Sequence, residues 1–147
     1  MGGLNKNRNR NPVTVNGLEA LYGAYRPPSR EECEEDPPRY LPQSSHPRIK
    51  TVGRTWRQAG RLVDFYLAVQ YQNSSGEWLD HMSIDCSHGH AHQHHYVDGE
   101  RDGNQPDSIM ILNTVADVQK ALKLSMARIM PTVHDLAVRL DAGGREA

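Results

Sequence analysis

Hydrophobic residues recur at every second position from Val63 to Tyr71. This alternation is typical of a strand with one buried face, because successive side chains of a strand point to opposite sides. The sequence predicts a strand at Ile49 to Trp56 before it, with Gly60 marking the turn between the two. Turn-forming residues at 72–76 and a returning strand at Trp78 to Asp85 follow it. The pattern predicts an antiparallel meander.

The hydrophobic period becomes helical after residue 114. One apolar face is shared by Val115, Val118, Leu122, Met126 and Ile129. Thr114 and Asp117 approximate a capping box, Pro131 is expected to kink or restart the helix, and Gly143-Gly144 to end it. The sequence therefore predicts an α+β fold, in which an antiparallel β-meander of three to four strands packs against a C-terminal helix or helix pair.

Residues 1–45 differ in composition from the rest of the chain. They combine a basic start with an acidic run at 31–36 that lies between two proline pairs. Helical spacing of apolar residues occurs there at Leu18, Leu21, Tyr22 and Tyr25. We expect residues 1–45 to form an irregular, proline-rich and acidic extension with one short helix, and residues 46–147 to form a single α+β domain.

The formal net charge of −1 excludes a globally basic nucleic-acid-binding protein. The charge is nevertheless uneven, because no Asp or Glu occurs between Pro37 and Val63, whereas six basic residues do. Within this stretch, Arg54 and Arg57 are the predicted phosphate contacts for RNA. The alternative is a solvated surface strand.

The chain has two cysteines, Cys33 and Cys86, which provide no disulfide framework. Its first residues lack the apolar region of a signal peptide, and no apolar stretch approaches the roughly 18 residues that span a bilayer. We therefore expect a soluble, cytoplasmic protein without a membrane partner.

The run from Cys86 to His95 carries the candidate chemistry. In one extended strand, His88, His90, His92 and His94 would line one face at spacings of roughly 6.6 Å. One interpretation is a site for zinc or another divalent transition metal, with His88, His90, His92 and Cys86 as ligands.

A second interpretation of the same run is general acid/base catalysis. His90 and His92 would act as acid and base, with Asp85 orienting one imidazole, as in a small ribonuclease-like hydrolase. The third is a polar strand face that binds metal only adventitiously. The sequence leaves all three open.

The middle of the chain resembles two kinds of small prokaryotic domain. The features that carry the resemblance are the strand-hairpin-strand order, Asp85, the series His88-Gly89-His90-Ala91-His92 and the closing helix. It is similar to an uncharacterised domain family with an Asp, His-Gly, His-x-His strand motif, and more distantly to the TumE-type toxin components of toxin-antitoxin systems. The resemblance picks out Asp85, His88, His90 and His92. It implies growth inhibition by acting on RNA, and a partner antitoxin.

The leading prediction is a prokaryotic or phage toxin-type protein that acts on RNA through a histidine-lined strand. Two alternatives are a non-catalytic, histidine-rich metal-binding module and an interaction protein of phage or prokaryotic origin. The apolar helix face either packs on the sheet or forms a dimer, and the sequence does not decide between these two alternatives.

Overall fold

A computed structural model of the protein describes residues 23–37 and 44–143. Its strands are β1 (Glu34–Glu35), β2 (Ile49–Gln58), β3 (Arg61–Gln72), β4 (Trp78–Ser87), β5 (His90–Val97), β6 (Glu100–Arg101) and β7 (Asp107–Ile111). Two helices follow, α1 (Ala116–Met126) and α2 (Ile129–Gly143), and a single 3₁₀ turn at Arg30–Glu32 precedes β1.

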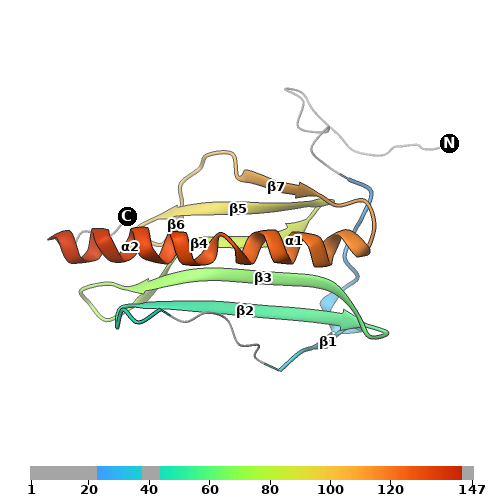
Figure 1. The fold of residues 1–147 in the computed structure, drawn as a ribbon, viewed down its shortest axis with the longest axis horizontal. Coiled ribbons are helices and arrows are strands. Elements are labelled where there is room, and N and C mark those ends of the chain that lie inside the picture. Colours follow the sequence, from blue (N-terminus) through green and yellow to red (C-terminus); the bar gives the residue numbers. More distant parts are fainter. Residues whose placement is uncertain (1–22, 38–43, 144–147) are drawn as a thin grey trace.

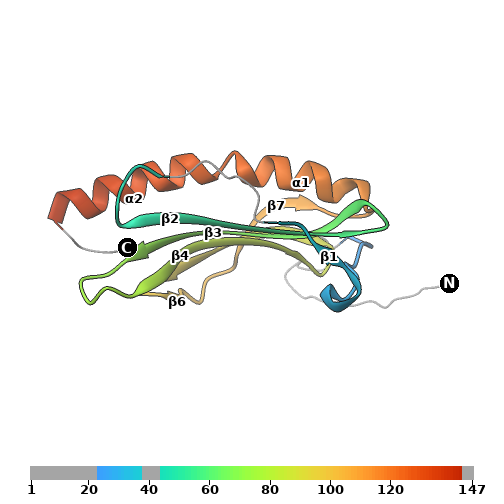
Figure 2. The same cartoon turned by 90° about the horizontal axis from the view of Figure 1, so that it is seen from below.

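The strands form one antiparallel sheet in the order β1-β2-β3-β4-β5-β6, and β7 also pairs with β5. Strand β6 pairs with the end of β5 at Tyr96 and Val97, whereas β7 pairs with its start, from His90 to Gln93. Both helices lie on one face of this sheet (Figures 1 and 2). The predicted α+β class and antiparallel meander are therefore confirmed.

The predicted strand count of three to four is too low, because the sheet has seven strands within the described residues. Two of the additional strands, β1 and β6, are two residues long and leave no readable alternation in a sequence. Strand β7 begins with the polar pair Asp107 and Ser108 directly after Pro106, so it lacks a hydrophobic start that a sequence pattern would show.

The histidine run is divided by a hairpin turn at His88 and Gly89, with φ angles of 55° and 73°. Positive φ at both central residues is what a two-residue type I′ hairpin requires. The expectation that His88 continues the row of His90, His92 and His94 is therefore wrong: His88 is an exposed turn residue, and β5 begins at His90.

The hydrophobic core fills the space between the helices and the sheet. Alternate residues of β3, from Phe65 to Tyr71, face it together with Met82, Ile84 and Ala91 of the next two strands. The helices contribute Val118, Ala121, Leu122, Ile129, Val133, Leu136 and Leu140. The apolar faces predicted for the strands and for the helices thus pack against each other in one core.

The predicted helix starts and breaks are found with one difference. Asp117 accepts the backbone N–H groups of Asn113 and Thr114 at 2.9 and 3.1 Å, but no side chain caps the first turn from the Ncap position, Val115. The chain then restarts as α2, with Pro131 in its first turn, where a missing N–H costs no intrahelical hydrogen bond. The alternative of two helices is the one that forms.

Residues 23–37 run along the sheet and hydrogen-bond to it. Gly23 N–H donates to the Gly89 carbonyl at 2.8 Å, and Tyr25 N–H donates to the Leu112 carbonyl at 3.0 Å. The described second half of the extension thus packs against the α+β domain, with β1 paired to β2. The predicted helix around Leu18 to Tyr25 falls almost entirely outside the described residues, and residues 23–29 are not helical.

Replacing Gly89 by alanine is expected to destabilise the fold by about 2–3 kcal/mol. An added Cβ at Gly89 would overlap the Gly23 backbone, so the hydrogen bond between the two segments cannot form as it does here. The matched control is Gly60→Ala, because Gly60 has a similar φ of +81° but no atom within 4 Å of its added Cβ. That control is expected to cost only about 1 kcal/mol. Equal losses in urea unfolding would contradict the role given to the Gly23 contact.

Candidate metal centre

The register between β4 and β5 builds the site. Asp85 lies opposite His92, Ser83 opposite His94 and Ser87 opposite His90. Since the intervening residues, such as Ala91, belong to the core under the helices, these polar residues occupy the other face of the sheet. The three histidines are nevertheless buried, at 5–9 % exposure.

Asp85, His92 and His94 form a compact group that can hold a metal ion. His92 Nε2 lies 3.0 Å from Asp85 Oδ1, and His94 Nε2 lies 3.5 Å from Asp85 Oδ2. All three ligand atoms are within 4.8 Å of one another. Two imidazole nitrogens and one carboxylate oxygen are a donor set typical of zinc and other divalent transition metals.

His90 lies on the side of the His92 ring that faces away from Asp85. Its Nδ1 lies 3.3 Å from Nδ1 of His92, and its Nε2 lies 2.7 Å from Oγ of Ser108 on β7. If Nε2 of His92 binds a metal, Nδ1 of His92 carries the proton and donates it to His90, which in turn donates from Nε2 to Ser108. His90 thus fixes the ring orientation and tautomer of a ligand.

The protonation states of the group suit metal binding. Burial raises the pKa of Asp85, but the hydrogen bond from His92 and the charges of His92, His94 and Arg101 outweigh it, so the pKa lies below its usual 3.8. Burial and the neighbouring His92 lower the pKa of His90 from 6.5 to about 4. Burial also lowers the pKa of His94. At neutral pH the carboxylate is ionised and these two imidazoles are neutral, as metal coordination requires.

Of the four ligands predicted from the sequence, His92 belongs to the compact group and the other three lie elsewhere. His88 is in the exposed turn, and His90 contacts His92 from behind. Cys86 donates its thiol to Asp64 Oδ1 at 3.1 Å, and burial, followed by the charge of Asp64, raises the pKa of that thiol. Cys86 is therefore held protonated beside Asp64, in contrast to the thiolate that a metal ligand must be.

The predicted acid/base trio of Asp85, His90 and His92 is brought together by the fold. Sequence reasoning placed His94 in the histidine row but in neither site, although its spacing of two residues from His92 was a usable signal. Ser108 carried no signal, because its place beside His90 depends on the pairing of β7 with β5.

The arginines predicted to contact RNA do not lie beside the histidines. Arg54 makes two hydrogen bonds to Glu35, at 2.9 and 3.0 Å, and Arg57 pairs with Asp36 at 3.0 Å. Both belong to β2, which β3 and β4 separate from the histidine strand β5. Arg54 shares a row with Asp85 through Tyr66, but two strand spacings, roughly 10 Å, lie between them.

No protein-family model, no curated protein and no solved structure matches this chain. The resemblance to TumE-type toxins stays a prediction, as do the antitoxin and RNA partners and the cytoplasmic location. Neither α1 nor α2 is long and apolar enough to cross a membrane, and these are the α-helices of the part of the chain that the structure describes.

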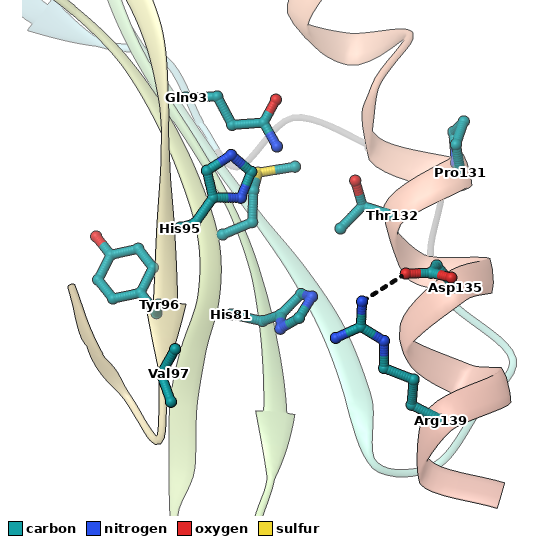
Figure 3. A pocket seen from close by; sticks show the side chains of 10 residues that line it. His81, Gln93, His95, Tyr96, Val97, Pro131, Thr132, Asp135 and Arg139 are labelled. Atoms are coloured by element: carbon teal, nitrogen blue, oxygen red, sulfur yellow. Dashed lines mark ion pairs between the residues drawn. The ribbon is translucent and has the colours of Figure 1, made fainter. Parts of the chain in front are cut away.

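A separate cavity of about 420 Å³ lies on the helical side of the sheet, between β4, β5 and α2 (Figure 3). His81, Gln93 and His95 face it from the strands, opposite the ion pair of Arg139 and Asp135 on the helix. Nδ1 of His81 is buried and has no hydrogen-bond partner among the residues that the structure describes. Burial, followed by the charge of Arg139, lowers the pKa of His81 from 6.5 to about 4.

This histidine makes the fold acid-sensitive. Above pH 6.5 His81 is neutral in both the folded and the unfolded chain, but between pH 6.5 and 4 only the unfolded chain takes up the proton. Stability is therefore lost as the pH falls through this window, by about 2 kcal/mol after allowance for partial exposure. We expect His81→Gln to reduce this loss in urea unfolding with EDTA present, whereas the exposed-turn control His88→Asn leaves it unchanged. An unaltered pH slope in His81→Gln would contradict this account.

Proposed function

We propose that the protein binds one divalent transition-metal ion, with zinc the best match, through Asp85, His92 and His94. The observation that carries the proposal is the convergence of these three donors within 4.8 Å on the face of the sheet opposite the helices. The low pKa of Asp85 and the lowered pKa of His94 support it, because these two donors need not lose a proton to bind at neutral pH.

The second support is the orientation of the His92 ring. A metal-bound histidine almost always donates its other N–H to a neighbouring acceptor, which fixes its tautomer. Nδ1 of His90 is that acceptor at 3.3 Å, and Ser108 on β7 accepts in turn from His90 at 2.7 Å. Side chains from three strands, β4, β5 and β7, thus form one row of contacts around the His92 ring.

The described residues supply three protein ligands, and this number favours a reactive site over a purely structural one. Structural zinc sites are almost always closed by four protein ligands, whereas catalytic sites have three and leave a position for water or substrate. Bound zinc supplies Lewis-acid chemistry there, including a lowered pKa for its water. Asp85, His92 and His94 hold the ion, and the hydrogen bond to His90 fixes the orientation of the His92 ring.

The test is metal stoichiometry in untagged, natively purified protein and after titration with zinc. We expect about one equivalent in the wild type and its loss in His94→Ala. The matched control is His95→Ala, because His95 is the next residue but lies off the group, bonded to Asp107 at 2.7 Å. Equal zinc binding by both variants and the wild type would contradict the site, and equal loss in both would indicate adventitious binding by a histidine-rich strand.

Action on RNA is a second candidate function. It is supported by the 3.0 Å contact of His92 with Asp85 and by the adjoining His90, an arrangement suited to general acid/base chemistry without a metal. A growth-inhibition and RNA-cleavage assay separates the two. Activity that survives EDTA but is lost in the His90→Ala, His92→Ala double variant favours acid/base chemistry, whereas activity lost in EDTA and restored by zinc favours the metal site.

A further inference from the structure

Arg101 lies close to the proposed metal site, because it shares a cavity with His94. It extends from β6, which pairs with the end of β5. After burial and the two histidines, its positive charge is the next influence on the pKa of Asp85, and it also acts on that of His94. Arg101 and His94 also line one cavity, so a permanent cation lies close to one of the three proposed ligands.

Among the described residues, the guanidinium of Arg101 contacts an aromatic side chain and not a carboxylate. Its Nε lies 3.5 Å from the Tyr96 hydroxyl, and its central carbon lies 6.0 Å from the centre of the Tyr96 ring. Within residues 23–37 and 44–143, no carboxylate forms an ion pair with it, whereas Arg54 and Arg57 are paired with Glu35 and Asp36. Its charge therefore remains available to a ligand.

A cavity of about 170 Å³ lies beside this arginine and is also lined by His94, one of the three proposed ligands. The rest of its lining is His95 and residues 102–106, which connect β6 to β7. This space exceeds the share of a single water, ~30 Å³, several times. The acid on its wall, Asp102, accepts the backbone N–H and the side-chain amide of Asn104 at 2.9 and 3.2 Å, so its carboxylate is turned into its own loop.

The charge of the site determines which ligand fits. Without a metal, the carboxylate of Asp85 offsets the charge of Arg101. With a divalent ion bound to Asp85 and two neutral histidines, the ion, Asp85 and Arg101 together carry two net positive charges. The carboxylate of Asp102, which is hydrogen-bonded within its own loop, offsets part of this charge. An anion with several oxygens can then reach the ion and the fork of an arginine together, and phosphate groups match that fork.

We propose that the metal ion and Arg101 together bind a phosphate group, as free phosphate or as a phosphate ester, in the cavity between His94 and Arg101. This inference rests on the proposed metal site and adds its substrate class. The phosphate oxygens lie between the two cations, and the Tyr96 hydroxyl positions the guanidinium.

The test uses protein loaded with cobalt(II), a paramagnetic substitute for zinc, and inorganic phosphate as the probe. Phosphate bound beside cobalt relaxes faster in ³¹P NMR. We expect strong relaxation with the wild type and a drop in apparent phosphate affinity of about 10-fold in Arg101→Gln, with cobalt uptake unchanged. The control is Arg139→Gln, which removes the same charge on the helical side of the sheet and should leave the relaxation unchanged. A parallel titration with dimethyl phosphate distinguishes a site for the free dianion from one for a phosphodiester.

The outcomes separate this inference from the proposed function. Stoichiometric cobalt with equal phosphate relaxation in wild type and Arg101→Gln overturns the phosphate site and leaves the metal site intact. No cobalt uptake overturns both. If Arg101→Gln fails to fold, Arg101→Lys takes its place, because it keeps the charge without the fork and should bind phosphate with intermediate affinity. Wild-type affinity in Arg101→Lys would then overturn the bidentate contact.

Discussion

Replacing His92 by alanine is expected to weaken zinc binding more than any other single change in the chain, on the order of 100-fold or more. His92 is both a ligand and the residue through which His90 and Ser108 act, so its loss removes one donor and the supporting hydrogen bonds together. His90→Ala is expected to cost about 10-fold, because it leaves the three donors in place but releases the His92 ring.

Competition with a chelator of known zinc affinity measures both effects. Ser108→Ala extends the series and is expected to have a smaller effect than His90→Ala, since its hydroxyl contacts only the far nitrogen of His90. The decisive comparison is between His90→Ala and His92→Ala. If His90→Ala loses as much zinc affinity as His92→Ala, His90 is itself a ligand, and the three-donor site is wrong.

Replacing Asp64 by alanine is expected to cost about 3 kcal/mol of stability. Asp64 is only 4 % exposed. It accepts hydrogen bonds from Arg30 Nε at 2.8 Å, the Phe65 N–H at 2.9 Å and the Cys86 thiol at 3.1 Å. The variant deprives three donors of an acceptor, and it also frees Arg30, whose guanidinium lies 3.8 Å from the centre of the Trp56 ring.

The control for this prediction is Asp135→Ala, which removes an exposed carboxylate from its ion pair with Arg139 on α2. Exposed pairs of this spacing contribute about 0.5 kcal/mol or less. Urea unfolding of both variants measures the difference. A loss below 1 kcal/mol in Asp64→Ala, about the size of the control, would mean that Asp64 does not anchor residues 23–37 to the sheet.

Much of the fold was readable from local pattern. The alternation from Val63 to Tyr71 lies within β3, and the apolar face from Val118 to Ile129 is buried in the core. Pro131 correctly indicated a restart of the helix. These features depend on residues close in sequence, where a backbone period of two or 3.6 is enough to determine which side chains share a face.

The candidate site was readable only in part. Spacing alone placed His90, His92 and His94 on one face, but it extended the row to His88, because a histidine-glycine pair within a run of histidines does not by itself mark a hairpin turn. The pairing of Asp85 with His92 required the register of that hairpin. A turn one residue away would have moved every histidine to the other face.

The sequence by itself determined the antiparallel strands, the helix pair and a row of imidazoles on one strand, since each follows from a short-range period. Only the tertiary structure decided that Asp85, His92 and His94 converge. It also decided that the Cys86 thiol donates a hydrogen bond to Asp64, and that Arg54 and Arg57 form ion pairs with Glu35 and Asp36. It likewise decided that Arg101 and His94 line one cavity. These contacts join separate strands, and which strands meet depends on the packing energy of the whole core, which no local pattern contains.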